Sequence, residues 1–100
     1  MKAVWNNATI AEAPKEELIR IEGNWYFPPD SLKKDLYKDS DLHTECFWKG
    51  TASYFDVEVN GETNDAAAWY YPLPMEGSTK KVGKDFAHYV AFWRGVEVTE

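Results

Sequence analysis

The sequence predicts a mainly β protein that folds as one small domain over residues 1–100, with an antiparallel sheet or an open, tent-like barrel and at most one or two short helical turns. Two stretches, 18–22 and 51–59, alternate apolar and polar residues with the period of two that is typical of half-buried strands. Other β-prone runs are separated by Gly, Pro and Asn at intervals of roughly 8 to 15 residues. Aromatic residues make up 16% of the chain, so rings can fill the core of one domain.

The first twenty residues predict a β-hairpin followed by a connector. Residues 3–5 and 9–11 are short β-prone runs on either side of Asn6-Asn7, and asparagine tolerates the positive φ that a tight turn requires. Residues 14–17 can form a single helical turn with proline at its first position. A helix that short needs tertiary packing, so we interpret it as a connector.

A second hairpin is expected next. Residues 18–22 form a predicted strand with the two isoleucines on one face and with Arg20 and Glu22 on the solvent face. Gly23-Asn24 is expected to turn the chain into the aromatic run 25–27. That run ends before two prolines, because proline cannot donate a hydrogen bond to a sheet.

The middle of the chain contains the clearest strand, 51–59. Before it, a short helix is expected at 31–36, and the acidic run 39–41 is expected to form the turn that ends this helix. After it, Asn60-Gly61 is a strong signal for a type I′ turn. The polar residues that follow indicate a loop longer than two residues.

The C-terminal part contains the last three predicted strands, 66–71, 87–93 and 96–98. Between the first two of them, residues 75–85 contain three lysines and two glycines without apolar periodicity, which predicts an exposed loop. The lysine-rich tip, 80–84, is either a solvated loop or a lid that holds a phosphate group.

The composition excludes several classes of function. A net charge of −6 repels phosphate backbones, so no nucleic-acid partner is expected. No membrane partner is expected either, because no stretch approaches the roughly 18 apolar residues of a membrane span and the N-terminus lacks a secretory signal pattern. The single cysteine fits a reducing compartment. We therefore expect a cytoplasmic protein, monomeric or homodimeric, without a cofactor.

The stretch 44–50 combines the only cysteine with two aromatic residues, a lysine and a turn glycine. If it is turned, His43 and Lys49 can approach Cys46 and lower the pKa of its thiol. If it is extended, both side chains point to the opposite face, and Cys46 is a small buried hydrophobic residue. His43 and Cys46 also have the spacing of metal ligands, but zinc needs three or four protein ligands, so no metal site is predicted.

We predict a ligand pocket in which a lysine meets an anionic group and rings provide the apolar wall. The residues assigned to this pocket are Tyr26, Cys46, Trp48, Lys49 and Trp69. No catalytic residue is assigned. Asp30, Asp39 and Asp41 can form a carboxylate pair or a cation site, but we interpret them as surface loop residues. We interpret His88 as a hydrogen-bonded sheet residue and not as a general base.

Five short motifs that span nearly the whole chain carry a family resemblance. They are Tyr26-Phe27-Pro28, Cys46-Phe47-Trp48-Lys49-Gly50, Ala52-x-Tyr54, Ala68-Trp69-x-Tyr71-x-x-Pro74 and Val90-Ala91-Phe92. In these motifs the chain resembles the bacterial family catalogued as domain of unknown function number 427, which has also been labelled a nucleotidyltransferase domain. The resemblance implies a small all-β domain with a tent-like or barrel-like shape. Phe47 departs from the family's usual proline.

The sequence gives little support to the activity in that label. Metal-dependent nucleotidyl transfer needs closely spaced carboxylates, typically Asp-x-Asp after a Gly-Ser turn. Asp39-Ser40-Asp41 has the spacing without the Gly-Ser, and a Lys-x-Asp-Gly motif is absent. The sequence therefore favours a domain that binds a small anionic or nucleotide-like ligand in an aromatic pocket. The alternatives are a group-transfer enzyme that uses Cys46 or a carboxylate, and a protein-interaction module.

Overall fold

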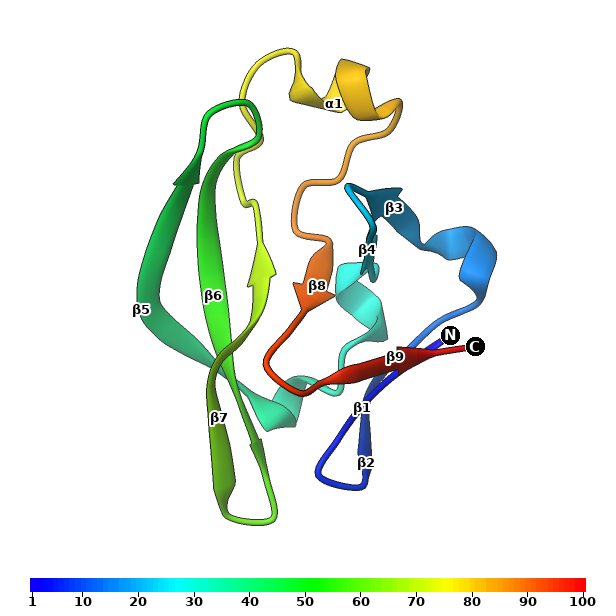
Figure 1. Cartoon of the computed structure of the whole chain (residues 1–100), viewed down its shortest axis with the longest axis vertical. Coiled ribbons are helices and arrows are strands. Elements are labelled where there is room, and N and C mark those ends of the chain that lie inside the picture. The colour runs from blue at the N-terminus through cyan, green and yellow to red at the C-terminus, as the bar shows by residue number, and fades with distance from the viewer.

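The computed structural model describes residues 1–100 and consists mainly of three antiparallel sheets (Figure 1). The strands are β1 (Lys2–Trp5), β2 (Ala8–Glu12), β3 (Ile19–Ile21), β4 (Asn24–Tyr26), β5 (Tyr37–Cys46), β6 (Gly50–Val59), β7 (Glu62–Tyr70), β8 (Val90–Phe92) and β9 (Glu97–Thr99). The sheets have the strand orders β2-β1-β9, β3-β4 and β5-β6-β7-β8, and none of them closes into a barrel. The predicted mainly β, antiparallel fold is confirmed.

Helical structure is limited to short pieces. They are α1 (Ser78–Val82) and the 3-10 turns η1 (Lys15–Glu17), η2 (Pro29–Ser31) and η3 (Lys34–Leu36). The turn η1 confirms the single helical turn expected after Pro14. The helix expected at 31–36 is wrong, because Leu32 is extended and forms an isolated bridge with Ala11 that separates η2 from η3. In turn, α1 lies in the stretch expected to be an exposed loop, and Gly83 ends it with a φ of 92°.

Three hairpins use two-residue turns in which both residues have positive φ, as strand twist favours. The φ values are 50° and 62° at Asn6-Asn7, 52° and 84° at Glu22-Gly23, and 52° and 79° at Asn60-Gly61. The first turn is as predicted. The longer loop expected after Asn60-Gly61 is wrong, because β7 pairs with β6 from Glu62 onward. The second turn lies one residue before its predicted position, so Glu22 belongs to the turn and not to the strand.

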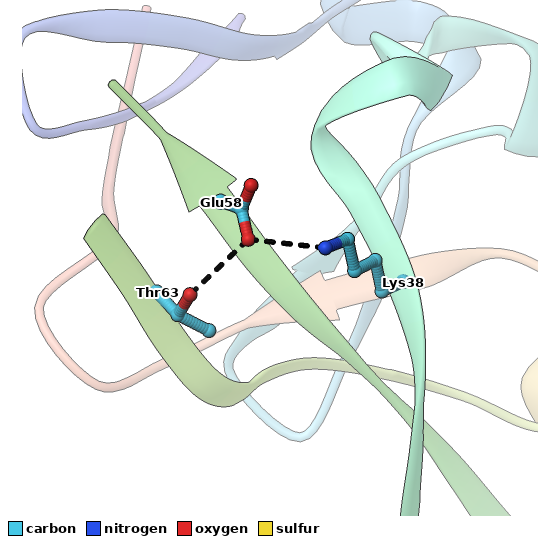
Figure 2. Close-up of polar contacts among 3 residues, drawn as sticks. All are labelled: Lys38, Glu58 and Thr63. Carbon is cyan, nitrogen blue, oxygen red and sulfur yellow. Dashed lines mark hydrogen bonds and ion pairs between the residues drawn. The ribbon is translucent and has the colours of Figure 1, made fainter. Parts of the chain in front are cut away.

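β5 replaces the turn expected at 39–41. It forms the outer strand of the third sheet and pairs with β6, with a register irregularity between Asp39 and His43. An outer strand tolerates polar residues because one of its edges faces solvent. Figure 2 shows a polar tie across this sheet, in which Glu58 of β6 accepts hydrogen bonds from Lys38 of β5 at 3.2 Å and from Thr63 of β7 at 3.3 Å.

β8 links the second and third sheets. It is shorter than the predicted strand 87–93, because His88 has a φ of 67° and Tyr89 donates a backbone hydrogen bond back to Phe86. On its free edge, Val90 and Phe27 exchange both backbone hydrogen bonds, at 2.7 and 2.9 Å. The β3-β4 hairpin is thereby held beside the third sheet.

Two clusters of buried side chains form the interior. The cluster that we call the terminal core includes residues of the first sheet, where the two chain ends lie side by side (Figure 1). Its members are Ala3, Ile10, Ala11, Ala13, Leu18, Phe27, Val57, Val59, Ala67, Ala68, Val90 and Phe92. The other cluster, which we call the tyrosine core, consists of Ile19, Ile21, Tyr26, Ala52, Tyr54, Ala66, Tyr71, Phe86 and Ala91. Consecutive residues of β7 serve different clusters, since Trp69 packs on the tyrosine core and Tyr70 on the terminal core.

Candidate functional site

The residues predicted to form a pocket all lie around the tyrosine core. Tyr26 is completely buried, and Cys46, Trp48 and Trp69 pack on this core while remaining partly exposed. The ammonium of Lys49 lies 5.2 Å from the ring centroid of Trp48, so it belongs to the same group. The structure thus brings the five residues together, and their binding of a ligand stays a prediction.

The turn between β5 and β6 determines where Lys49 lies. Cys46 pairs with Gly50, so the three residues between them form the connection. Gly50 has a φ of 114°, and a Cβ atom there would lie 3.3 Å from the backbone of both Leu73 and Met75. The backbone N–H of Met75 also donates a 2.8 Å hydrogen bond to the carbonyl of Lys49. The segment after β7 therefore packs directly on this turn, and glycine is required at the contact.

Lys49 is a buried cation with one counter-ion. Its side chain is 9% exposed, and its Nζ lies 2.5 Å from Oε1 of Glu22, whose side chain is 55% exposed. The positive φ of Glu22 places this residue in the β3-β4 turn. The ring of Tyr71 lies 5.3 Å from the same ammonium. Because a buried charge without a partner is costly, Glu22 stabilises the buried position of Lys49.

The ion pair keeps both of its members charged. Burial by itself lowers the pKa of Lys49, but the hydrogen bond to Glu22 and the nearby tyrosines outweigh it, so that the net shift is upward. The same hydrogen bond lowers the pKa of Glu22, with further lowering from the Trp48 indole and from the Lys81 ammonium. Burial raises the pKa of Tyr71 to about 12, so its phenol stays neutral at physiological pH.

Tyr26 and Trp69 satisfy each other's polar groups. The indole Nε1–H of Trp69 donates a 3.0 Å hydrogen bond to the hydroxyl of Tyr26, and the two rings meet edge to face at 6.2 Å. Phe86 also packs on Tyr26, with a centroid distance of 6.5 Å and an interplanar angle of 68°. These two predicted site residues therefore form part of the wall of the site and leave few free polar groups for a ligand.

A hollow of about 350 Å³ opens beside the ion pair, and we call it the Trp48 hollow. It is lined by Arg20, Ile21, Glu22, Trp48, Lys81 and Val82. The ammonium of Lys81 lies 4.7 Å from the centroid of the Trp48 ring. The guanidinium of Arg20 lies 4.9 Å from the ring of Trp25. The hollow thus combines two cationic side chains, one carboxylate and one indole.

Arg20, Glu22 and Lys81 were not among the predicted site residues. The sequence gives Arg20 and Glu22 only as the solvent face of a strand, and Lys81 only as part of a lysine-rich loop. The only indication for Lys81 in the sequence was its place in a lysine-rich segment that could hold a phosphate group. Nothing in the sequence indicated that Glu22 pairs with Lys49, because 27 residues separate them. The direction of the Glu22 carboxylate also depends on its place in the turn, which lies one residue earlier than predicted.

Cys46 has no histidine beside it on the same face of its strand. β5 is extended from Tyr37 to Cys46, and His43 pairs with Ser53 while Cys46 pairs with Gly50. Residues three positions apart in a strand point to opposite faces. Of the two arrangements considered for this stretch, the structure has the extended one up to Cys46, whose thiol is partly buried against the tyrosine core.

Asp39 and Asp41 are exposed on β5. No group of three or more His, Cys, Asp or Glu side chains in the structure is arranged to hold a metal ion. None of the helices is both long enough and apolar enough to cross a membrane.

Comparison with known proteins bears on the family resemblance. No curated protein matches the chain. The family described as "Domain of unknown function (DUF427)" matches residues 1–100, which is the whole chain, and confirms the resemblance carried by the five motifs. The chain belongs to the DUF427 family.

Proposed function

We propose that the domain binds a small anionic, nucleotide-like ligand in the Trp48 hollow. The observation that carries the proposal is the grouping of Arg20, Glu22, Trp48 and Lys81 around one hollow of about 350 Å³. Ligand sites are typically concave, with an apolar wall and a few converging polar groups. A nucleotide offers a planar base, hydrogen-bond donors on its edge and a phosphate, and each of these has a counterpart here.

The anionic part of the ligand meets Arg20 and Lys81. Both side chains are exposed, and neither takes part in an ion pair within the chain. Arginine matches the geometry of phosphate oxygens through its planar fork of donors, and lysine adds a flexible point charge. The two cations therefore supply a local positive charge on a chain whose net charge is −6.

The planar part of the ligand stacks on Trp48, and its donor edge faces Glu22. Stacking of a base on an aromatic side chain contributes about 1–3 kcal/mol. A carboxylate accepts hydrogen bonds from amino groups such as those on adenine, cytosine or guanine. Glu22 is more than half exposed, so one carboxylate can be shared between Lys49 and a ligand.

Lys49 has a different role in this proposal from the one expected from the sequence. Its ammonium is buried and already paired with Glu22, so the anion meets Lys81 and Arg20 first. Lys49 acts as a positioning residue that holds the Glu22 carboxylate at the edge of the hollow. Tyr26, Cys46 and Trp69 support the wall behind it.

Tryptophan fluorescence tests the proposal directly, because Trp48 lines the hollow. Titration with AMP is expected to change the emission of the protein, and Trp48→Phe is expected to remove most of that change. Lys81→Gln is expected to weaken AMP binding by about 2- to 5-fold, in line with an exposed charge pair. Lys80→Gln is the matched control, because Lys80 is the adjacent exposed lysine of α1 and does not line the hollow.

Two outcomes would contradict the proposal as a whole, and a third would contradict its anionic part. One is an emission that does not change with AMP, adenosine or inorganic phosphate up to the solubility limit. The other is an equal loss of affinity in Lys81→Gln and Lys80→Gln, which would indicate attraction to the whole surface. Binding of adenosine as tight as that of AMP would exclude the anionic contact and leave only the stacking.

A further inference from the structure

A second hollow, of about 240 Å³, is lined in part by Tyr70 of β7 and shares no residue with the Trp48 hollow. We call it the Tyr70 hollow. The residues of its lining that matter here are Leu32, Lys34, Tyr37, Phe55, Tyr70 and His88. Five of its eight lining residues are hydrophobic, whereas the Trp48 hollow is lined half by charged side chains.

Three of these side chains form a run of nearly parallel rings. Phe55 and Tyr70 stack at a centroid distance of 4.6 Å and an interplanar angle of 19°. Tyr70 and His88 follow at 6.2 Å and 25°. Tyr37 closes the side of the run, with its edge toward Phe55 at 5.6 Å and 78°. A planar ring is the shape that such an aromatic wall accommodates best.

His88 is held at this wall by an uncommon backbone conformation. Its φ is 67°, and its N–H donates a 3.1 Å hydrogen bond to the carbonyl of Tyr71. A side chain other than glycine adopts such a φ at a cost, and residues of this kind cluster at binding sites. The conformation ends β8 early and leaves an exposed imidazole against Tyr70.

The charged groups around the hollow favour a ligand with a negative charge. Lys34 is its one permanently charged lining residue, and it makes no ion pair with the rest of the chain. Burial raises the pKa of the Tyr70 phenol, and the nearby Asp39 carboxylate raises it further, so the phenol stays neutral. An anion is therefore attracted toward Lys34, and the Asp39 carboxylate disfavours its placement at the Tyr70 end of the hollow.

The volume limits the ligand to a small molecule. An apolar cavity of about 150 Å³ holds benzene, and sites for larger ligands begin at about 300 Å³. The Tyr70 hollow, at about 240 Å³, lies between these values. It accommodates one ring with a short substituent.

We propose that the Tyr70 hollow binds a single-ring aromatic carboxylate, with the ring against Tyr70 and Phe55 and the carboxylate at Lys34. Leu32 and Tyr37 complete the apolar lining around the ring, and His88 closes the end of the aromatic run. The proposal is independent of ligand binding at the Trp48 hollow.

Histidine signals in the proton NMR spectrum provide the test, because the chain contains only two histidines. Titration with benzoate is expected to shift the imidazole signals of His88 and to leave those of His43, which does not line the hollow, unchanged. The variant His88→Gln identifies which signals belong to His88. Benzamide, which has the same ring without the charge, is expected to bind about 2- to 5-fold more weakly.

Lys34→Gln is expected to weaken benzoate binding by the same factor and to leave benzamide binding unchanged. Lys33→Gln is its matched control, since Lys33 is exposed and adjacent but does not line the hollow. Equal shifts of both histidines, or no shift of His88 up to the solubility limit, would overturn the proposal. Acetate that shifts His88 as strongly as benzoate would overturn the role of the ring, and unchanged benzoate affinity in Lys34→Gln would overturn the role of the charge.

Discussion

The two faces of β7 are both rich in aromatic rings, but they differ in whether their polar groups are paired within the protein. On the Trp69 face, the polar groups of the tyrosine core are paired within the protein, through the Trp69–Tyr26 hydrogen bond and the Glu22–Lys49 ion pair. On the Tyr70 face, the rings stack with few polar contacts and border a more apolar hollow. The period of two in one strand therefore produces two chemically different surfaces from adjacent residues.

The contrast indicates that the stability of the tyrosine core depends on specific hydrogen bonds and ion pairs, whereas that of the terminal core depends on how completely its side chains fill the interior. No buried side-chain N or O atom in the structure lacks a hydrogen-bond partner. Removal of one partner on the Trp69 face leaves the other partner unsatisfied, which costs more than the loss of an average hydrogen bond. In the terminal core, truncation of a side chain lowers the free energy of unfolding mainly because it leaves a cavity. Four sets of substitutions test this difference.

Phe27→Ala is expected to give the largest effect, a loss of roughly 3–5 kcal/mol in the free energy of unfolding. Phe27 is completely buried in the terminal core and meets Phe92 edge to face at 5.5 Å. Chemical denaturation measures the loss. Phe47→Ala is the control, because Phe47 is 90% exposed and its removal is expected to change stability by less than about 0.5 kcal/mol. Equal losses in the two variants would contradict this assignment of the core.

Glu22→Gln is expected to cost roughly 1–2 kcal/mol, less than a fully buried ion pair because Glu22 is half exposed. Lys49→Met is expected to cost less, since it removes the buried charge together with its need for a partner. Because the folded pKa of Glu22 is lowered, its contribution is present above the unfolded pKa of about 4.3 and is lost as the pH falls through the folded pKa. Denaturation at pH 7 and in acid should therefore show the difference between wild type and Glu22→Gln shrinking in acid.

Tyr26→Phe and Tyr37→Phe compare the two faces with the same chemical change. Tyr26→Phe leaves the indole N–H of Trp69 without its acceptor and is expected to cost about 1–2 kcal/mol. Tyr37 donates to the carbonyl of Ile10, which also accepts a hydrogen bond from the backbone of Lys33, so Tyr37→Phe is expected to cost about 0.5–1 kcal/mol. Thermal melting of both variants measures the order, and a larger loss in Tyr37→Phe would reverse the contrast.

Lys38→Ala is expected to give the smallest effect, at most about 0.5 kcal/mol. Its ion pair with Glu58 joins side chains that are 67% and 41% exposed, and Glu58 keeps its hydrogen bond from Thr63 (Figure 2). Any difference from wild type should disappear in high salt, because salt screens exposed charges. A loss above 1.5 kcal/mol that persists in about 1 M salt would show that the outer strand depends on this tie.

Much of the fold could be predicted because its signals are local. The alternation in 51–59 and the turn at Asn6-Asn7 depend on neighbouring residues, and both form as predicted. The predicted turn at 39–41 failed because the chain pairs with β6 on both sides of it, up to Asp39 and again from His43, so that only a register irregularity remains between them. The predicted loop after Asn60-Gly61 failed for the same reason, since polar residues on an exposed face can still pair.

The grouping of the five residues assigned to the pocket could be anticipated, because most aromatic side chains in a small chain lie in or against the core; binding there stays a prediction. Tyr26, Cys46, Trp48, Lys49 and Trp69 do gather around the tyrosine core. The charged side chains that complete the Trp48 hollow were missed. Arg20 and Glu22 come from the β3-β4 hairpin and Lys81 from α1, so their grouping depends on how separate elements pack.

Residue patterns were sufficient to predict the mainly β class, the first hairpin and the aromatic interior, because hydrophobic alternation and turn preferences act over a few neighbouring positions. The tertiary structure alone decided that Glu22 pairs with Lys49 across 27 residues and that Tyr70 stacks with His88. Those contacts require the β3-β4 hairpin, the β5-β6 turn and the segment before β8 to be placed around β7. That placement depends on the packing of the whole chain, so no short sequence pattern could predict it.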